Sequence, residues 1–177
     1  SVLGGGSTSR INMNLRQDKH WAYGAQSLIL DAQGQRPFVV YAPVQTDKTS
    51  ESMAEIYKEV SHIRGERPPT AIEVARAKDK NTLTLAGRWE TAGAVASSLA
   101  DMVRFELPDK NWDEYPDMVR SLSDDQISGA AEDVIRPDTM VWVVVGDRDE
   151  IERKIAELGY GDIVLMDADG NVVDESQ

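Results

Sequence analysis

Two side chains near the start of the sequence, Arg16 and Tyr23, could act together on one oxygen atom. A guanidinium and a phenolic O–H both donate hydrogen bonds, and such donors stabilise negative charge that develops on an oxygen during a reaction. Arg16 falls near the end of an expected helix and Tyr23, seven positions later, at the start of an expected strand. A tight turn between the two would aim both side chains the same way. Ordinary roles also fit, because Arg offsets the dipole at a helix C-terminus and Tyr is common on half-buried strands.

A glycine-rich stretch, Leu3-Gly4-Gly5-Gly6, precedes this pair and is followed by Ser-Thr-Ser-Arg. Three glycines permit close backbone approach and a sharp bend. One of the following hydroxyl residues is expected to cap the next helix by accepting hydrogen bonds from its first N–H groups. A phosphate-binding loop is an alternative, but such a loop carries a lysine that this stretch lacks.

The combined pattern is Leu-Gly-Gly, Ser-Arg, Leu-Arg and then aromatic-Ala-Tyr-Gly, over residues 3–24. It resembles the pitrilysin/insulinase-like zinc metallopeptidases, which include the mitochondrial processing peptidases, and in particular their second, non-zinc half, the inactive C-terminal domain. The similarity continues to a strand–Gly-Asp–helix unit over residues 141–158. One departure is His20-Trp21, where a glycine is common in the family. It leaves the Arg/Tyr pair intact but bears on the geometry of the turn.

The resemblance implies roles for the residues singled out above. Arg16 and Tyr23 would bind the peptide substrate across from a zinc-bearing half, which supplies zinc, base and water. Gly4, Gly5 and Gly6 would form a bend that could also act as a hinge for a segment covering a bound peptide. The partner half would lie in the same polypeptide or in a separate subunit.

The residues themselves predict no zinc site in this chain. The catalytic half of the family carries His-x-x-Glu-His, whereas this chain has two histidines, His20 and His62, far apart in sequence. A hydrolytic zinc site needs about three protein ligands and an open position. We therefore expect His20 in a turn, His62 on the polar face of a helix, zinc in the partner half only, and no proteolysis by this chain alone. Asp167-Ala168-Asp169-Gly170 faintly resembles a calcium loop but is expected to be a turn.

Composition places the 177 residues among globular proteins, with 41% hydrophobic and 28% charged residues. No apolar run approaches the roughly 20 residues of a membrane-spanning helix. The net charge is −12, and residues 101–177 carry 21 acidic and 7 basic residues. We expect the acidic half to be a solvated helix surface and, without a basic stripe, no nucleic-acid partner. Cysteine is absent, which excludes disulfides and thiolate chemistry.

Residue periodicity predicts an α+β fold, a mainly antiparallel sheet with helices packed on one face, as the resemblance also implies for this metallohydrolase fold. We expect one domain over residues 1–177, shortened at its N-terminus relative to the family. The expected elements are a hairpin over 23–30 and 37–42, a helix over 46–63, a helix from the Thr70/Glu73 capping box through Lys80, helices over 95–103, 113–122 and 123–134, a buried strand over 140–145, a helix over 147–158 and a strand over 163–166.

Two functions remain open at this point. The first is the substrate-binding, non-catalytic domain of a zinc metalloendopeptidase, with a peptide and a zinc-bearing half as partners. The second is a structural or assembly subunit that has the peptidase fold and no activity. Retention of Arg16 and Tyr23 favours the first. The compartment is not fixed by the sequence; a bacterial periplasmic or other extracytoplasmic location is a guess from the resemblance and the lack of cysteine.

Overall fold

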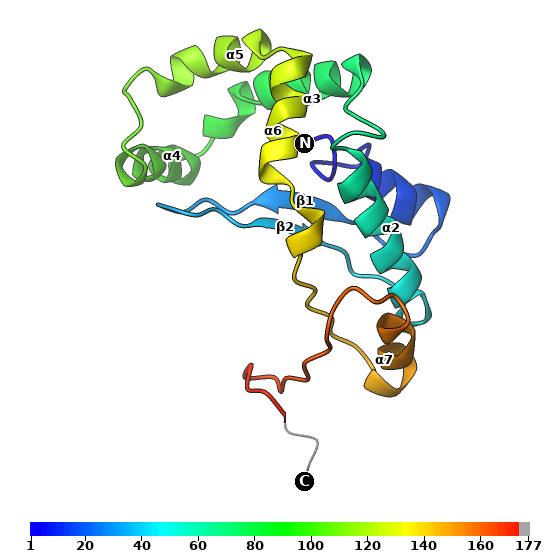
Figure 1. Ribbon diagram of the computed structural model, residues 1–177. Helices are drawn as coiled ribbons and strands as arrows, with labels where there is room; N and C mark the ends of the chain where they lie inside the picture. Colours follow the sequence, from blue (N-terminus) through cyan, green and yellow to red (C-terminus); the bar gives the residue numbers. More distant parts are fainter. Residues whose placement is uncertain (174–177) are drawn as a thin grey trace.

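A single antiparallel hairpin lies at the centre of the computed structural model, which describes residues 1–173, and helices surround it (Figure 1). The fold is α+β, as predicted. The elements are α1 (Arg10–Asn12), the π-helix η1 (Met13–Asp18), β1 (Gln26–Ile29), β2 (Phe38–Tyr41), the 3₁₀ turn η2 (Thr46–Lys48), α2 (Thr49–His62), α3 (Ala71–Leu83), η3 (Ala86–Trp89), α4 (Ala92–Arg104), α5 (Asn111–Ser121), α6 (Asp124–Val134), η4 (Pro137–Thr139) and α7 (Arg148–Ala156).

The hairpin confirms the expected pairing of the first two strands. β1 and β2 run antiparallel, with Gln26 opposite Tyr41 and Ile29 opposite Phe38. The connecting loop contains Gly34 at φ 120°, a backbone conformation that glycine adopts at little cost. One face of the hairpin turns inward, because Phe38 and Val40 pack against the core.

The core lies between the hairpin, the N-terminal segment and α2. Helix α2 buries residues spaced three and four apart, as the helical period requires. The fully or nearly fully buried apolar side chains of this cluster are Leu3, Ile11, Leu15, Ala25, Ile56, Val60, Ile63 and Ile135. Because the N-terminal segment supplies three of them, the glycine-rich loop and η1 are held directly against the hairpin.

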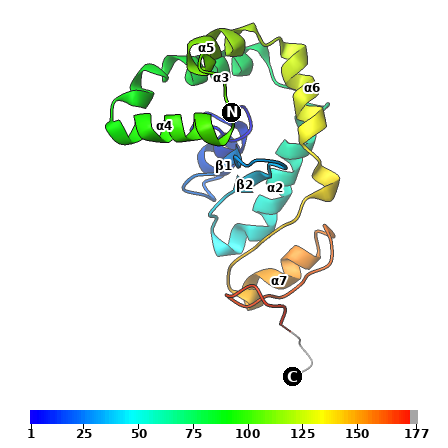
Figure 2. The same ribbon diagram turned by 90° about the vertical axis from the view of Figure 1, so that its left-hand side faces the viewer.

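Helices α3, α4, α5 and α6 form an arch beside the hairpin, most easily followed in Figure 2. The predicted capping box begins α3: the Thr70 hydroxyl accepts from the Glu73 amide, and the Glu73 carboxylate accepts from the Thr70 amide. Ser123 and Gln126 form the same reciprocal pair at α6. Reciprocal caps satisfy backbone N–H groups that the helix itself leaves unpaired, so they fix where both helices begin.

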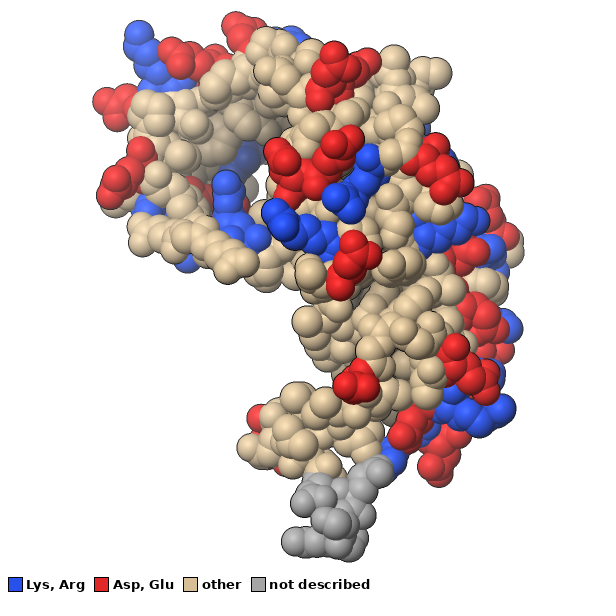
Figure 3. Space-filling view, viewed as in Figure 1, with Lys and Arg blue, Asp and Glu red and all other residues tan. Residues whose placement is uncertain are grey.

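The predicted buried strand over 140–145 is wrong. Met140 and Trp142 pack against the core, but Val141, Val143 and Val145 are 87%, 85% and 94% exposed. The segment alternates as a strand does, yet within residues 1–173 no neighbouring strand takes its backbone hydrogen bonds. It is therefore an extended segment covered on one side only. Figure 3 shows that in this view the charged side chains gather on the upper part and the right-hand edge of the molecule, whereas its lower left is mostly uncharged.

The expected strand over 163–166 is also wrong, because only Met166 forms an isolated bridge, with Val172. The predicted helix before it is present as α7 and packs against α2. Tyr160, after α7, stacks on Tyr57 of α2 with ring centroids 4.9 Å apart and on Trp142 at 5.7 Å. These stacked rings attach the C-terminal part of the described chain to the core.

Candidate functional site

The structure brings Arg16 and Tyr23 together at the surface. The Arg16 guanidinium carbon lies 5.6 Å from the centroid of the Tyr23 ring, within the range of a cation–π contact. Tyr23 is 91% exposed, so its ring and hydroxyl face solvent. The expectation that both side chains point the same way is correct as geometry. Whether they bind substrate is a separate question.

Arg16 lies in an irregular helix. Residues Met13–Asp18 form η1, a π-helix, and the Lys19 amide donates to the carbonyl five residues earlier, that of Asn14, at 3.1 Å. A π-helical turn accommodates one more residue than an α-helical turn, and such turns are frequent at functional sites. The sequence predicted a helix here but not its π geometry.

The turn between Arg16 and Tyr23 depends on His20. Its φ is +59°, in the left-handed region that non-glycine residues seldom adopt. The His20 Nδ1 lies 3.1 Å from the Arg16 carbonyl oxygen, and the Gln45 side chain donates to the His20 carbonyl, also at 3.1 Å. Glycine adopts this left-handed conformation at little cost, whereas a histidine needs support. Here two side-chain contacts hold a histidine in that conformation.

Tyr23 lies outside β1, which corrects its expected place at the start of a strand. Ala22 pairs with Val44, and the ladder resumes where Gln26 pairs with Tyr41. Three residues separate Ala22 from Gln26, whereas two separate Tyr41 from Val44. The ladder is interrupted between these two pairings, and the side of the hairpin that carries Tyr23 has one residue more than the other; we call residues 23–25 the bulge. It explains why Tyr23 projects so far into solvent.

The glycine-rich loop packs closely against β1. A Cβ at Gly4 would lie 2.0 Å from the Ser27 amide nitrogen, and the Gly4 carbonyl accepts from that amide at 2.9 Å. Gly5 donates to the Ser1 carbonyl, and Lys80 of α3 donates to the Gly5 carbonyl. Close approach is thus one reason for glycine here. The hinge role of Gly4, Gly5 and Gly6 stays a prediction.

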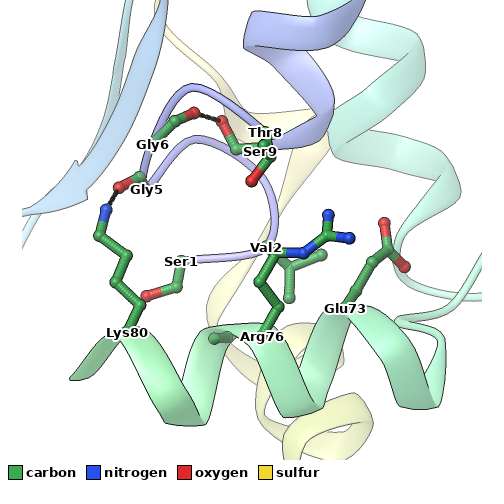
Figure 4. Close-up of a pocket in the computed structure, with 10 residues that line it drawn as sticks. Ser1, Val2, Gly5, Gly6, Thr8, Ser9, Glu73, Arg76 and Lys80 are labelled. Carbon is green, nitrogen blue, oxygen red and sulfur yellow. Dashed lines mark hydrogen bonds between the residues drawn. The ribbon is translucent and has the colours of Figure 1, made fainter. Parts of the chain in front are cut away.

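A small cavity of about 40 Å³ lies between this loop and α3 (Figure 4). Glu73, Arg76 and Lys80 project toward it from α3, and Ser9 donates from its hydroxyl to the Gly6 carbonyl. This space is large enough for ordered water, and Lys80 beside it is already bound to the Gly5 carbonyl. The geometry therefore gives no support to the phosphate-loop alternative.

An ion pair that the sequence analysis missed fixes this loop to α3. Arg10 is 4% exposed and binds both carboxylate oxygens of Glu73 at 2.7 Å, and it also donates to the carbonyls of Arg67 at 2.5 Å and Pro68 at 2.9 Å. The hydrogen bonds from Arg10 lower the pKa of Glu73 from 4.5 to about 2. Glu73 thus serves the capping box and Arg10 together. Arg10 is the first residue of α1, and all three residues of that short helix are buried.

A larger polar cleft of about 340 Å³ lies between η1, α2 and the start of α3. Its charged groups are largely paired with one another: besides Arg10 with Glu73, Arg67 binds Glu59 at 3.2 Å and Lys19 lies 3.4 Å from Glu55. The side-chain amide of Asn14 also donates to Glu55 and to Glu59. Pairing of this kind stabilises the contact between three helices, and it engages most of the charged groups that line the cleft.

No group of three or more His, Asp or Glu side chains able to hold a metal lies within residues 1–173. His62 lies on α2, as predicted, and its Nε2 is 3.1 Å from Glu66. Asp167 turns its carboxylate back onto the chain, where it accepts from the side chain and backbone amide of Asn171 and from the Asp169 amide, and these bonds, that of the Asn171 side chain above all, lower its pKa. Asp167–Gly170 is therefore a turn, as predicted. None of the helices in the same described part is long and apolar enough to cross a membrane.

Residues 1–81, which contain the loop, Arg16 and Tyr23, match the model of the peptidase M16 inactive domain family. The matched stretch is a little under half of the chain, and over it the sequence is similar to the inactive domain of M16 peptidases. No match was found among curated protein sequences.

Solved structures extend the likeness of fold beyond the matched residues. The chain is similar to the crystal structure of a peptidase M16 inactive domain from Pseudomonas fluorescens, with TM-score 0.66, 20% identity and 77% of this chain aligned with 32% of that one. A protease from Helicobacter pylori gives TM-score 0.66, 18% identity and the same coverages. A Bordetella pertussis Tohama I protein, described as a candidate zinc protease, gives 0.61 and 18%, aligning 76% of this chain with 72% of that one. This chain therefore spans about a third of the length of the first two.

Proposed function

We propose that this chain is the substrate-binding, non-zinc domain of a zinc metalloendopeptidase, and that Arg16 and Tyr23 bind carbonyl oxygens of the peptide. The zinc ion, the general base and the attacking water would come from a zinc-bearing half, in the same polypeptide or in a separate subunit. The M16 inactive-domain match over residues 1–81 supports a peptidase context. The likeness to a candidate zinc protease agrees with it.

The observation that carries the proposal is the exposed Arg16–Tyr23 pair on an irregular backbone. A π-helix, a left-handed histidine and the bulge occur within residues 13–25, and together they put a guanidinium beside a solvent-facing phenol. Irregular backbone of this kind costs free energy, of order 1–3 kcal/mol per strained residue, and tends to cluster at functional sites. Arg16 itself is half-buried, whereas Tyr23 is 91% exposed and therefore available to a ligand.

The chemistry fits peptide hydrolysis. Negative charge develops on the carbonyl oxygen of the attacked peptide bond, and donors aimed at that oxygen stabilise the transition state more than the ground state. Arg16 supplies a permanently charged planar donor and Tyr23 a neutral O–H. If they instead bind neighbouring carbonyls, they hold the peptide in register, and the loop at Gly4–Gly6 could move to cover it.

The test uses the full-length protein together with its zinc-bearing half. Arg16→Ala and Tyr23→Phe are compared with Arg36→Ala and Tyr41→Phe, which remove the same groups from exposed positions of the hairpin. We expect losses of kcat/KM on the order of 10²-fold for the first pair, with unchanged zinc content and melting temperature. A loss confined to KM would indicate uniform binding of the peptide. Wild-type kinetics in both site variants would refute the proposal and leave the structural or assembly subunit as the better explanation.

A further inference from the structure

Asn12 is a buried polar residue to which no role is assigned by the sequence pattern. It is the last residue of α1 and 4% exposed. Its side-chain NH₂ donates to the Ser7 carbonyl at 2.8 Å, and its side-chain oxygen accepts from the Ala25 amide at 3.1 Å. One amide therefore joins the end of the glycine-rich loop to the β-bulge beside Tyr23.

The two partners leave the Asn12 amide a single orientation. A backbone carbonyl only accepts and a backbone N–H only donates, so the NH₂ must face Ser7 and the oxygen must face Ala25. Among the residues of similar size, aspartate keeps the acceptor but loses the donor when ionised, and leucine keeps neither. The contact thus depends on the amide of asparagine and not on its volume.

Ala25 lies in the unpaired stretch between Ala22 and Gln26, so its amide has no partner on β2. It donates instead to the side-chain oxygen of Asn12. Ala25 is 8% exposed, and an unpaired buried N–H is costly. Tyr23 lies two residues earlier and points into solvent. Loss of the contact at Ala25 would allow the bulge to relax and would move Tyr23 away from Arg16.

We infer that Asn12 is a positioning residue that couples the glycine-rich loop to Tyr23, and this inference rests on the proposed function of the Arg16–Tyr23 pair. Asn12 does not reach substrate, since it is buried beneath the loop. It transmits the position of the Ser7 carbonyl to the bulge, so a displacement of the loop changes the separation of Arg16 and Tyr23.

The first arm of the test reads geometry without activity. The 177-residue chain is labelled with ¹³C in its tyrosine rings, and the NMR signal of Tyr23 is the one missing from Tyr23→Phe. The change of this signal in Arg16→Ala then reports loss of the contact between Arg16 and the Tyr23 ring. We expect Asn12→Ala to reproduce that change while the protein remains folded. Asn12→Asp, which keeps the acceptor for Ala25, should keep more of the wild-type signal. Thr82→Val removes another buried hydrogen-bonding hydroxyl, on α3, and should leave the Tyr23 signal unchanged.

The second arm measures kinetics in the full-length protein with its zinc-bearing half. Asn12→Ala should lower kcat/KM by roughly 10-fold to 10²-fold, the cost of misplacing a group by about 1 Å. Thr82→Val should not lower it per folded molecule. A Tyr23 signal like that of the wild type in folded Asn12→Ala would overturn the inference. If Arg16→Ala and Tyr23→Phe keep wild-type kinetics, the proposed function fails, and the NMR arm still decides whether Asn12 positions Tyr23.

Discussion

Replacing Arg10 by methionine removes the most connected buried charge in the N-terminal region. The side chain of Arg10 is 3% exposed, and its guanidinium donates two bonds to the Glu73 carboxylate and one each to the carbonyls of Arg67 and Pro68. Methionine fills a similar length without charge or donors. The substitution therefore tests how far the contact between the loop and α3 stabilises the whole chain.

The expected cost follows from what remains after the substitution. Removing one partner of a buried ion pair typically destabilises a protein by about 3–5 kcal/mol, because the other charge stays buried and unpaired. Glu73 is only partly buried, at 23% side-chain exposure, and keeps its bonds to Thr70. We therefore expect a loss at the lower end, about 3 kcal/mol, with part of it from the two carbonyls left without a donor. Against a typical stability of about 5–15 kcal/mol, this is a large fraction.

Urea unfolding of the 177-residue chain, followed by circular dichroism, measures this loss as a lowered midpoint at constant slope. The matched control is Arg153→Met, because Arg153 binds Glu157 at 3.2 Å but the two side chains are 82% and 63% exposed. An exposed pair contributes about 0–1 kcal/mol, so the control should unfold near the wild-type midpoint. A cost below about 1 kcal/mol for Arg10→Met would refute the argument that this ion pair holds the N-terminal segment in place.

Two further predictions concern pH and association. Hydrogen bonds, chiefly from Arg10, lower the pKa of Glu73 from 4.5 to about 2. The ionised Glu73 therefore stabilises the folded chain fully above pH 4.5, and this stabilisation is lost as the pH falls toward 2. The free energy of unfolding of the wild type should fall by about 1–2 kcal/mol more than that of Glu73→Gln as the pH is lowered. This is less than the full pKa shift implies, because solvent screens the partly exposed carboxylate. Equal acid-unfolding profiles of the two proteins would contradict the prediction. The exposed Val141, Val143 and Val145 should make the chain self-associate, and threonine at all three should reduce association in sedimentation velocity. A compact wild-type monomer at high concentration would count against this.

Local signals in the sequence predicted the elements well. The predicted capping box at Thr70 begins a helix in the structure, a helix also starts at the expected position after Ser123, and the turn before Pro37 connects two paired strands. These features depend on residues within four or five positions of one another, so the sequence contains the whole cause. The helical period of α2 likewise predicted its buried face.

The errors share a different origin. The segment over 140–145 has the residue types of a buried strand, but burial and pairing depend on a neighbour that the pattern of the segment cannot specify. Tyr23 was expected within a strand because a bulge changes no residue type; it follows from the register with Val44 and Tyr41. Arg10 was passed over since its partner, Glu73, is 63 residues away. In each case the deciding contact is distant in sequence.

Arg10 and Asn12 show how a very short helix supports the site. Helix α1 has three residues, too few to be stable alone, because the first helical turn costs more conformational entropy than one hydrogen bond returns. Its two polar side chains bind in different directions, Arg10 to Glu73 of α3 and Asn12 to Ala25 beside β1. Loss of the first should lower the free energy of unfolding of the chain, whereas loss of the second should act mainly on the Arg16–Tyr23 separation. Stability and site geometry are therefore separable by substitutions two residues apart, which the urea and NMR measurements can establish in the same pair of variants.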